Sequence, residues 1–153
     1  GGGSREEARG RSQAWGEGSG VGTPQALIDR QAVAWDPLVS WSARALLAPL
    51  NVSFGLMPVV QPADSLARLR RHVHAMSTFQ LAALHDLVAL SGSLIIGLAA
   101  ARNHLEVEDL WNLSRVDESW QAEQWGDDET AIAEAGIKRE AFFCAHSFFD
   151  LCK

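Results

Sequence analysis

Several side chains capable of catalysis or metal binding occur in close pairs along the sequence. The pairs are Asp117 with Glu118, His72 with His74, His85 with Asp86, and Cys144 with His146. A helix turns about 100° per residue, so neighbours one or two positions apart point to different sides. The two members of such a pair therefore cannot converge by themselves. They would need distant residues to form an acid–base couple, a metal site or a thiol–histidine dyad. The sequence therefore predicts no enzyme activity, no metal and no cofactor.

Composition and charge narrow the class of protein. The 153 residues are 47% hydrophobic and 21% charged, which fits one globular domain. The net charge of −6 argues against nucleic-acid binding, because that requires many Lys and Arg side chains. The longest apolar run, Leu87 to Ala101, is too short for membrane insertion. Cys144 and Cys152 would lie about 12 Å apart along a helix, beyond disulfide reach, so we expect a reducing compartment.

The first 22 residues are rich in glycine and contain few large apolar side chains. Such a segment cannot offset its ordering entropy by burial, so residues 1–22 are predicted to be a flexible leader or linker. Its opening GGGS suggests a linker or the remnant of a truncated part. The string GEGSGVG lacks both the spacing of a dinucleotide loop and the lysine of a phosphate loop, so no nucleotide is expected.

Residues 23–153 are predicted to form one helical domain, a multihelical bundle of about seven helices. Thr23 and Pro24 begin a helix that ends near Trp35, and Asp36 with Pro37 starts the next, so WDPLVSW is interpreted as a helix-turn-helix corner. Prolines and a glycine exclude a long helix between residues 51 and 61. This segment is predicted to be extended or irregular, with a short strand at 52–54.

The second half of the chain is predicted to contain most of the core. A surface helix runs from Leu66 to Met76, and Ser77 with Gln80 forms a capping box for the next helix. Ser91, Gly92 and Ser93 then permit a close approach or a kink. The residues that follow, 94–101, are apolar on all sides and belong at the centre of a bundle. A helix from about Leu105 to Trp125 and one capped by Asp127 complete the fold.

The helix predicted from Leu105 to Trp125 is unusual, because it combines tryptophans with acids. Nine acids and one base, Arg115, occur between Glu106 and Glu129, so this segment carries −8 and the rest of the chain +2. An ideal helix would have two apolar faces, one with Val107, Trp111, Ser114, Glu118 and Trp125, and an opposite one with Leu113, Val116 and Trp120. Glu118 would lie within an apolar stripe, either paired with Arg115 or reserved for a donor on a partner.

Four segments resemble one protein family in the same order along the chain. They are WDPLVSW, MPVVQP, LHDLVALSGSLIIGLA and LSRVDESWQAEQWG. The chain resembles, from about Pro24 onward, the assembly chaperones dedicated to the alpha subunit of the F-type ATP synthase catalytic sector. The SGSL and WDPL segments favour an alphaproteobacterial member over a mitochondrial one. The family also has a β-rich N-terminal part, to which residues 1–22 show no similarity.

The resemblance implies a non-enzymatic role. The chaperone would bind the free alpha subunit and cover the surface that a beta subunit later occupies, without consuming ATP. It would act in the bacterial cytoplasm, or in the mitochondrial matrix if eukaryotic. Asp117, Glu118, Gln121 and Trp125 are the predicted client site, whereas Asp36 and Trp41 are expected to be structural.

Two other functions are compatible with the sequence. One is a helical scaffold or oligomerisation module without chaperone activity, in which the two-faced helix packs on a second copy. The other is a hydrolase using Asp86 or Glu118, which would need a deep polar cleft that the sequence does not predict.

Overall fold

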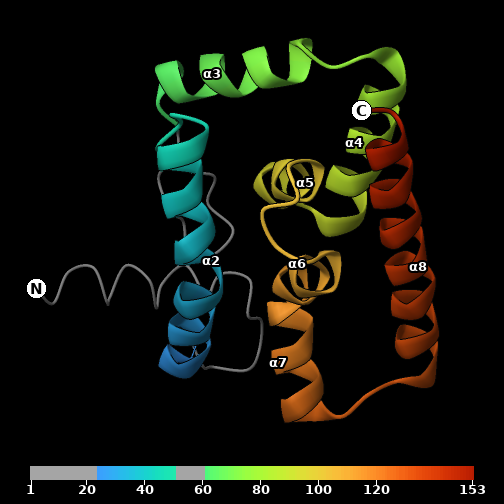
Figure 1. The fold of residues 1–153 in the computed structure, drawn as a ribbon. Coiled ribbons are helices and arrows are strands. Elements are labelled where there is room, and N and C mark those ends of the chain that lie inside the picture. Colours follow the sequence, from blue (N-terminus) through green and yellow to red (C-terminus); the bar gives the residue numbers. More distant parts are fainter. Residues whose placement is uncertain (1–23, 51–60) are drawn as a thin grey trace, which may run out of the picture. The chain divides into compact units, whose positions relative to one another are not determined.

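The computed structural model describes residues 24–50 and 61–153. Within these ranges the chain forms seven helices and no strand (Figure 1). This confirms the predicted mainly α fold. The helices are α2 (Gln25–Ala45), α3 (Ala63–His74), α4 (Thr78–Ser91), α5 (Leu94–Ala101), α6 (Val107–Ser114), α7 (Val116–Trp125) and α8 (Glu129–Leu151). The predicted leader at 1–22, the Thr23 cap and the strand at 52–54 lie outside the described residues.

The chain divides into two compact units, Gly1–Leu66 and Ala67–Lys153. In the first unit, α2 is one continuous helix that contains Pro37, so the predicted corner at WDPLVSW is wrong. Proline removes the hydrogen bond that the carbonyl four residues earlier would accept. Here that carbonyl belongs to Val33, whose side chain is exposed like Pro37 itself, so water can solvate the carbonyl in place of the lost bond. The expected structural residue Trp41 is buried, whereas Asp36 is exposed.

Side-chain hydroxyls fix the turn that follows α2. Ser42 is buried and donates from Oγ to the carbonyl of Ala48 over 2.9 Å. Ser65, also buried, donates to the carbonyl of Pro49 and so holds the start of α3 against this turn. Buried hydroxyls are tolerated because both are hydrogen-bonded. The helix predicted from Leu66 to Met76 begins earlier and ends earlier than expected, as α3.

In the second unit, α4 pairs with α8, and α5 contacts α4, α6 and α8. Figure 1 shows α4 and α8 side by side, with α5 and α6 next to them. Residues 96–101 of α5 are all buried, which confirms the predicted central position of this helix. The core of the unit also includes Leu84, Leu87, Leu110, Trp111, Phe142 and Phe149.

The helix ends of this unit follow local sequence signals. Ser77 Oγ accepts from the Gln80 amide at 3.2 Å and the Gln80 side chain accepts from the Ser77 amide at 2.8 Å, so the predicted capping box is confirmed. Gly92 ends α4 with a φ of 74°, which only glycine adopts easily, and Ser93 caps α5. The last helix is capped by Asp128, not by Asp127 as predicted, because the Asp128 carboxylate accepts from the amide of Thr130. None of the described helices is long and apolar enough to cross a bilayer.

Candidate functional site

The helix predicted from Leu105 to Trp125 is broken at Arg115. Arg115 has φ −110° and ψ 16°, which separates α6 from α7. The Ser114 hydroxyl donates to the Trp111 carbonyl at 2.6 Å, a local bond that competes with regular helix pairing. Trp111 and Val116 would lie about 140° apart on a straight helix, yet both are buried. The prediction of one continuous two-faced helix is therefore wrong, and the break instead allows both side chains to be buried.

Glu118 does not occupy an apolar stripe. Its side chain is 52% exposed, and its Oε1 lies 3.9 Å from Nη1 of Arg115, three residues earlier. The Arg115 guanidinium also lies 5.7 Å from the centre of the Trp111 ring. Of the two alternatives for Glu118, the pairing with Arg115 is the one present. An exposed pair of this kind contributes at most about 1 kcal/mol, so Glu118 is held only weakly.

The four predicted client-site residues share one side of α7. Asp117, Glu118, Gln121 and Trp125 fall within about 100° of one another on an ideal helix, and all four are exposed. We call this surface the α7 face. Trp125 is 82% exposed, an uncommon state for a side chain with so large an apolar area. The α7 face therefore offers two carboxylates, an amide and an indole to solvent on a single helix.

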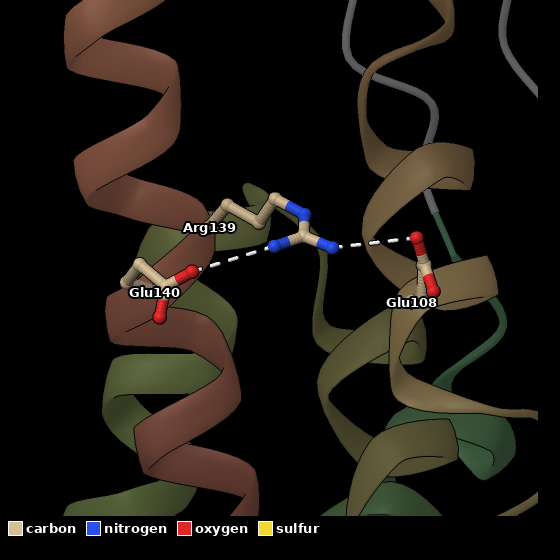
Figure 2. Close-up of polar contacts among 3 residues, drawn as sticks. All are labelled: Glu108, Arg139 and Glu140. Carbon is tan, nitrogen blue, oxygen red and sulfur yellow. Dashed lines mark hydrogen bonds and ion pairs between the residues drawn. The ribbon is translucent and has the colours of Figure 1, made fainter.

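The helix that precedes the α7 face, α6, is held against α8 by an ion pair and by aromatic contacts. Figure 2 shows the guanidinium of Arg139 on α8 between Glu108 on α6 and Glu140. The N–O distances are 3.3 Å to Glu108 and 3.4 Å to Glu140. The same guanidinium lies 4.3 Å from the centre of the Phe143 ring. The same two helices also meet at Trp111 and Phe142, whose ring centres are 5.5 Å apart. These contacts were missed in the sequence, because Glu108 and Arg139 are 31 residues apart and carry no local signal.

A second polar network joins the turn after α5 to the end of α8. Asn103, in the left-handed region with φ 51°, donates from Nδ2 to Asp150 Oδ1 at 2.9 Å and accepts from His146 Nε2 at 2.6 Å. Lys153 lies 2.9 Å from the same carboxylate. The hydrogen bond from Asn103, aided by Lys153 and His146 and opposed by desolvation, holds the pKa of Asp150 below its ordinary value of 3.8.

The Asp150→Asn variant tests this network by pH. Because the folded pKa lies below the unfolded value, the ionised carboxylate favours the folded state. Its stabilisation is present above about pH 4 and disappears as the pH falls through the folded pKa. We expect the variant to melt below the original protein at pH 7, and the difference in melting temperature to shrink at pH 3. An unchanged difference at the two pH values would contradict this role of the Asp150 charge.

The other reactive pairs remain apart from the α7 face. His72 Nδ1 accepts from the guanidinium of Arg102 at 2.6 Å. His85 and Asp86 are exposed on α4, with 3.8 Å between Nδ1 and Oδ1. Cys144 is exposed, whereas His146 belongs to the Asn103 network. The described residues thus bring none of these pairs to the predicted client site.

The chain is similar, in sequence and in fold, to proteins of known structure. No family model matches the sequence. The crystal structure of Atp12 from Paracoccus denitrificans is 44% identical, with a TM-score of 0.82 over 86% of this chain and 56% of that one. A mutant of the P. denitrificans protein gives the same values. The Atu1473 protein of Agrobacterium tumefaciens, provisionally described as a chaperone, is 34% identical, with a TM-score of 0.81 over 86% of this chain and 50% of that one. This chain therefore spans about half the length of the proteins that it resembles.

Proposed function

Because the chain belongs to the Atp12 family of assembly chaperones, we propose that it acts in ATP synthase assembly by binding the free alpha subunit of the F-type catalytic sector. Binding would cover the alpha-subunit surface that a beta subunit later occupies, and so prevent aggregation of the free subunit. An exposed subunit interface larger than a few hundred Å² is an aggregation hazard. The role requires no catalysis, and the bacterial sources of the similar proteins favour the cytoplasm as its compartment.

The observation that carries the proposal is the α7 face. Trp is the side chain most enriched at binding hot spots, and Trp125 is 82% exposed beside the carboxylates of Asp117 and Glu118. An exposed indole can enter a pocket on the client, while the carboxylates orient the encounter with basic groups. The weak pairing of Glu118 with Arg115 costs little to exchange for a client contact.

The test measures aggregation of isolated alpha subunit, by light scattering, with and without this chain. We expect the chain to suppress aggregation and added beta subunit to displace it. Trp125→Ala and Glu118→Lys should each weaken alpha-subunit binding about 10-fold or more, because each removes a central side chain of the contact. Thermal melts should stay within about 2 °C of the original protein, because both side chains are exposed.

Two control variants on α4 match these changes. Asp86→Lys alters the net charge as Glu118→Lys does, and Phe79→Ala removes an exposed aromatic ring as Trp125→Ala does. Both should bind the alpha subunit normally. Equal weakening by controls and α7 variants would contradict the assignment of the site. A stable symmetric oligomer with no effect on alpha-subunit aggregation would instead favour the scaffold function.

A further inference from the structure

The last helix, α8, carries an apolar stripe that is separate from its buried face. Its members recur with spacings of four, three, four and three residues, and all are exposed: Ile137, Ala141, Cys144, Phe148 and Leu151. Ile137 is 70% and Leu151 84% exposed. On an ideal helix the five lie within about 40° of Ile137 on either side. We call this surface the α8 stripe.

The α8 stripe does not belong to the core of the unit. The buried residues Phe142, Ala145 and Phe149 lie about 80–140° around the helix from Ile137. They account for the packing of α8 against its neighbours α4, α5 and α6. The helix therefore has one apolar face that the fold uses and a second that the fold leaves in solvent.

We propose that the α8 stripe binds an amphipathic helix of a partner protein, one that carries basic residues beside its own apolar stripe. Alternating spacings of three and four residues form the seam into which a second helix inserts its side chains. Ala141 and Cys144 are small and central, which allows close approach of the partner backbone. Ile137 and Phe148 supply bulk towards the two ends. An extended strand, with a period of two residues, would not match this register.

Charge identifies the partner further. From Asp127 to Glu140 the chain has five acids and two bases, and one of these bases, Arg139, is paired with Glu108. The first half of the α8 stripe thus lies in an acidic environment. In the second half, Asp150 and Lys153 pair with each other at 2.9 Å. A basic partner helix would complement the acidic half, whereas a second copy of α8 has no basic half to offer.

This surface is distinct from the α7 face, so the inference does not depend on the proposed client site. The test uses the full chain and fluorescent helical peptides with leucines at spacings of three and four residues. One peptide has lysines beside the leucines, a second has glutamates there, and a third has the composition of the first with leucines at every second position. Fluorescence anisotropy should show saturable binding of the lysine peptide, and binding at least about 10-fold weaker for the other two.

Variants of the chain locate the contact. Ile137→Gln and Leu151→Gln should each weaken binding of the lysine peptide about 10-fold. Ile132→Gln is the matched control, because Ile132 is 55% exposed on the same helix but lies about 140° from Ile137. The bound peptide should also slow alkylation of the Cys144 thiol, which lies on the stripe, more than that of Cys152.

Several results would overturn the proposal. Equal affinity for the lysine and glutamate peptides would show that the stripe does not select a basic partner. If the Ile132 and Ile137 variants weakened peptide binding equally, the α8 stripe would not be the binding surface. Concentration-dependent dimerisation that Ile137→Gln abolishes would identify a second copy as the occupant instead. The alpha-subunit assay with Trp125→Ala is independent, so failure of one proposal can be distinguished from failure of the other.

Discussion

Phe142→Ala lowers the free energy of unfolding by about 3–5 kcal/mol, a large share of the stability of an ordinary domain. Phe142 is fully buried, and its ring packs 5.5 Å from that of Trp111. Removing the ring loses its transfer free energy and leaves a cavity between α8 and α6 that helices on both sides cannot close. Urea denaturation followed by circular dichroism measures the change. We also expect α6 to loosen, and with it the support of the α7 face.

The control for this prediction is Phe148→Ala on the same helix. Phe148 is 43% exposed and belongs to the α8 stripe, so its removal should cost less than about 1 kcal/mol. Similar losses for the two variants would mean that α8 is packed through a different face from the one described.

Gly97→Ala destabilises the protein by about 1–3 kcal/mol, although alanine is the better helix former. A Cβ added at Gly97 would lie 2.7 Å from Cγ2 of Val88 and 3.4 Å from the Val88 amide nitrogen. The valine is branched at Cβ and has one strongly preferred rotamer in a helix, so its methyl group cannot easily move aside. The added methyl group must therefore push α5 away from α4. Chemical denaturation of the variant measures the loss.

The same substitution at Gly136 has the opposite expected sign. Nothing lies within 4 Å of a Cβ added there, so Gly136→Ala should stabilise α8 by about 0.5–1 kcal/mol through the reduced entropy of the unfolded chain. If both variants changed stability in the same direction, the close approach of α5 and α4 at Gly97 would be contradicted.

Local signals were sufficient to predict much of the fold. The capping box at Ser77 and the central position of the apolar helix at 94–101, of which residues 96–101 are buried, each depend on neighbouring residues, and both were confirmed. The predictions at Pro37 and Arg115 were wrong, because whether a helix continues or breaks there depends on the solvent and the neighbouring helices around it. Pro37 is exposed, so water can solvate the backbone around it and α2 continues. Trp111 and Val116 are both buried only because the helix breaks between them, and no residue type in this segment predicts such a break. The predicted number of about seven helices agrees with the structure only because two errors cancel. Two predicted helices form the single helix α2, and one predicted helix is divided into α6 and α7.

The candidate site was predicted less completely than the fold. Helical spacing places Asp117, Glu118, Gln121 and Trp125 on one face, and α7 brings them together in solvent. The reason first given for Glu118, a carboxylate within an apolar stripe, depended on a continuous helix that the break at Arg115 removes. The polar contacts that join the helices of this unit connect residues 31 to 47 positions apart, such as Arg139 with Glu108 and Asn103 with Asp150. Helical periodicity contains no information about such distant partners.

The pairing of α4 with α8 has a consequence for the order of folding. It closes a loop from Gly92 to Asp128, 37 residues that include α5, α6 and the α7 face. Closing a loop of this length costs entropy before the contacts between its ends are gained, so α4–α8 docking is expected to limit the folding rate. Until α8 docks, the apolar residues of α5 and α6 lack their cover. A chain with the role proposed above must therefore bury its own core through this distant contact before it can shield a client.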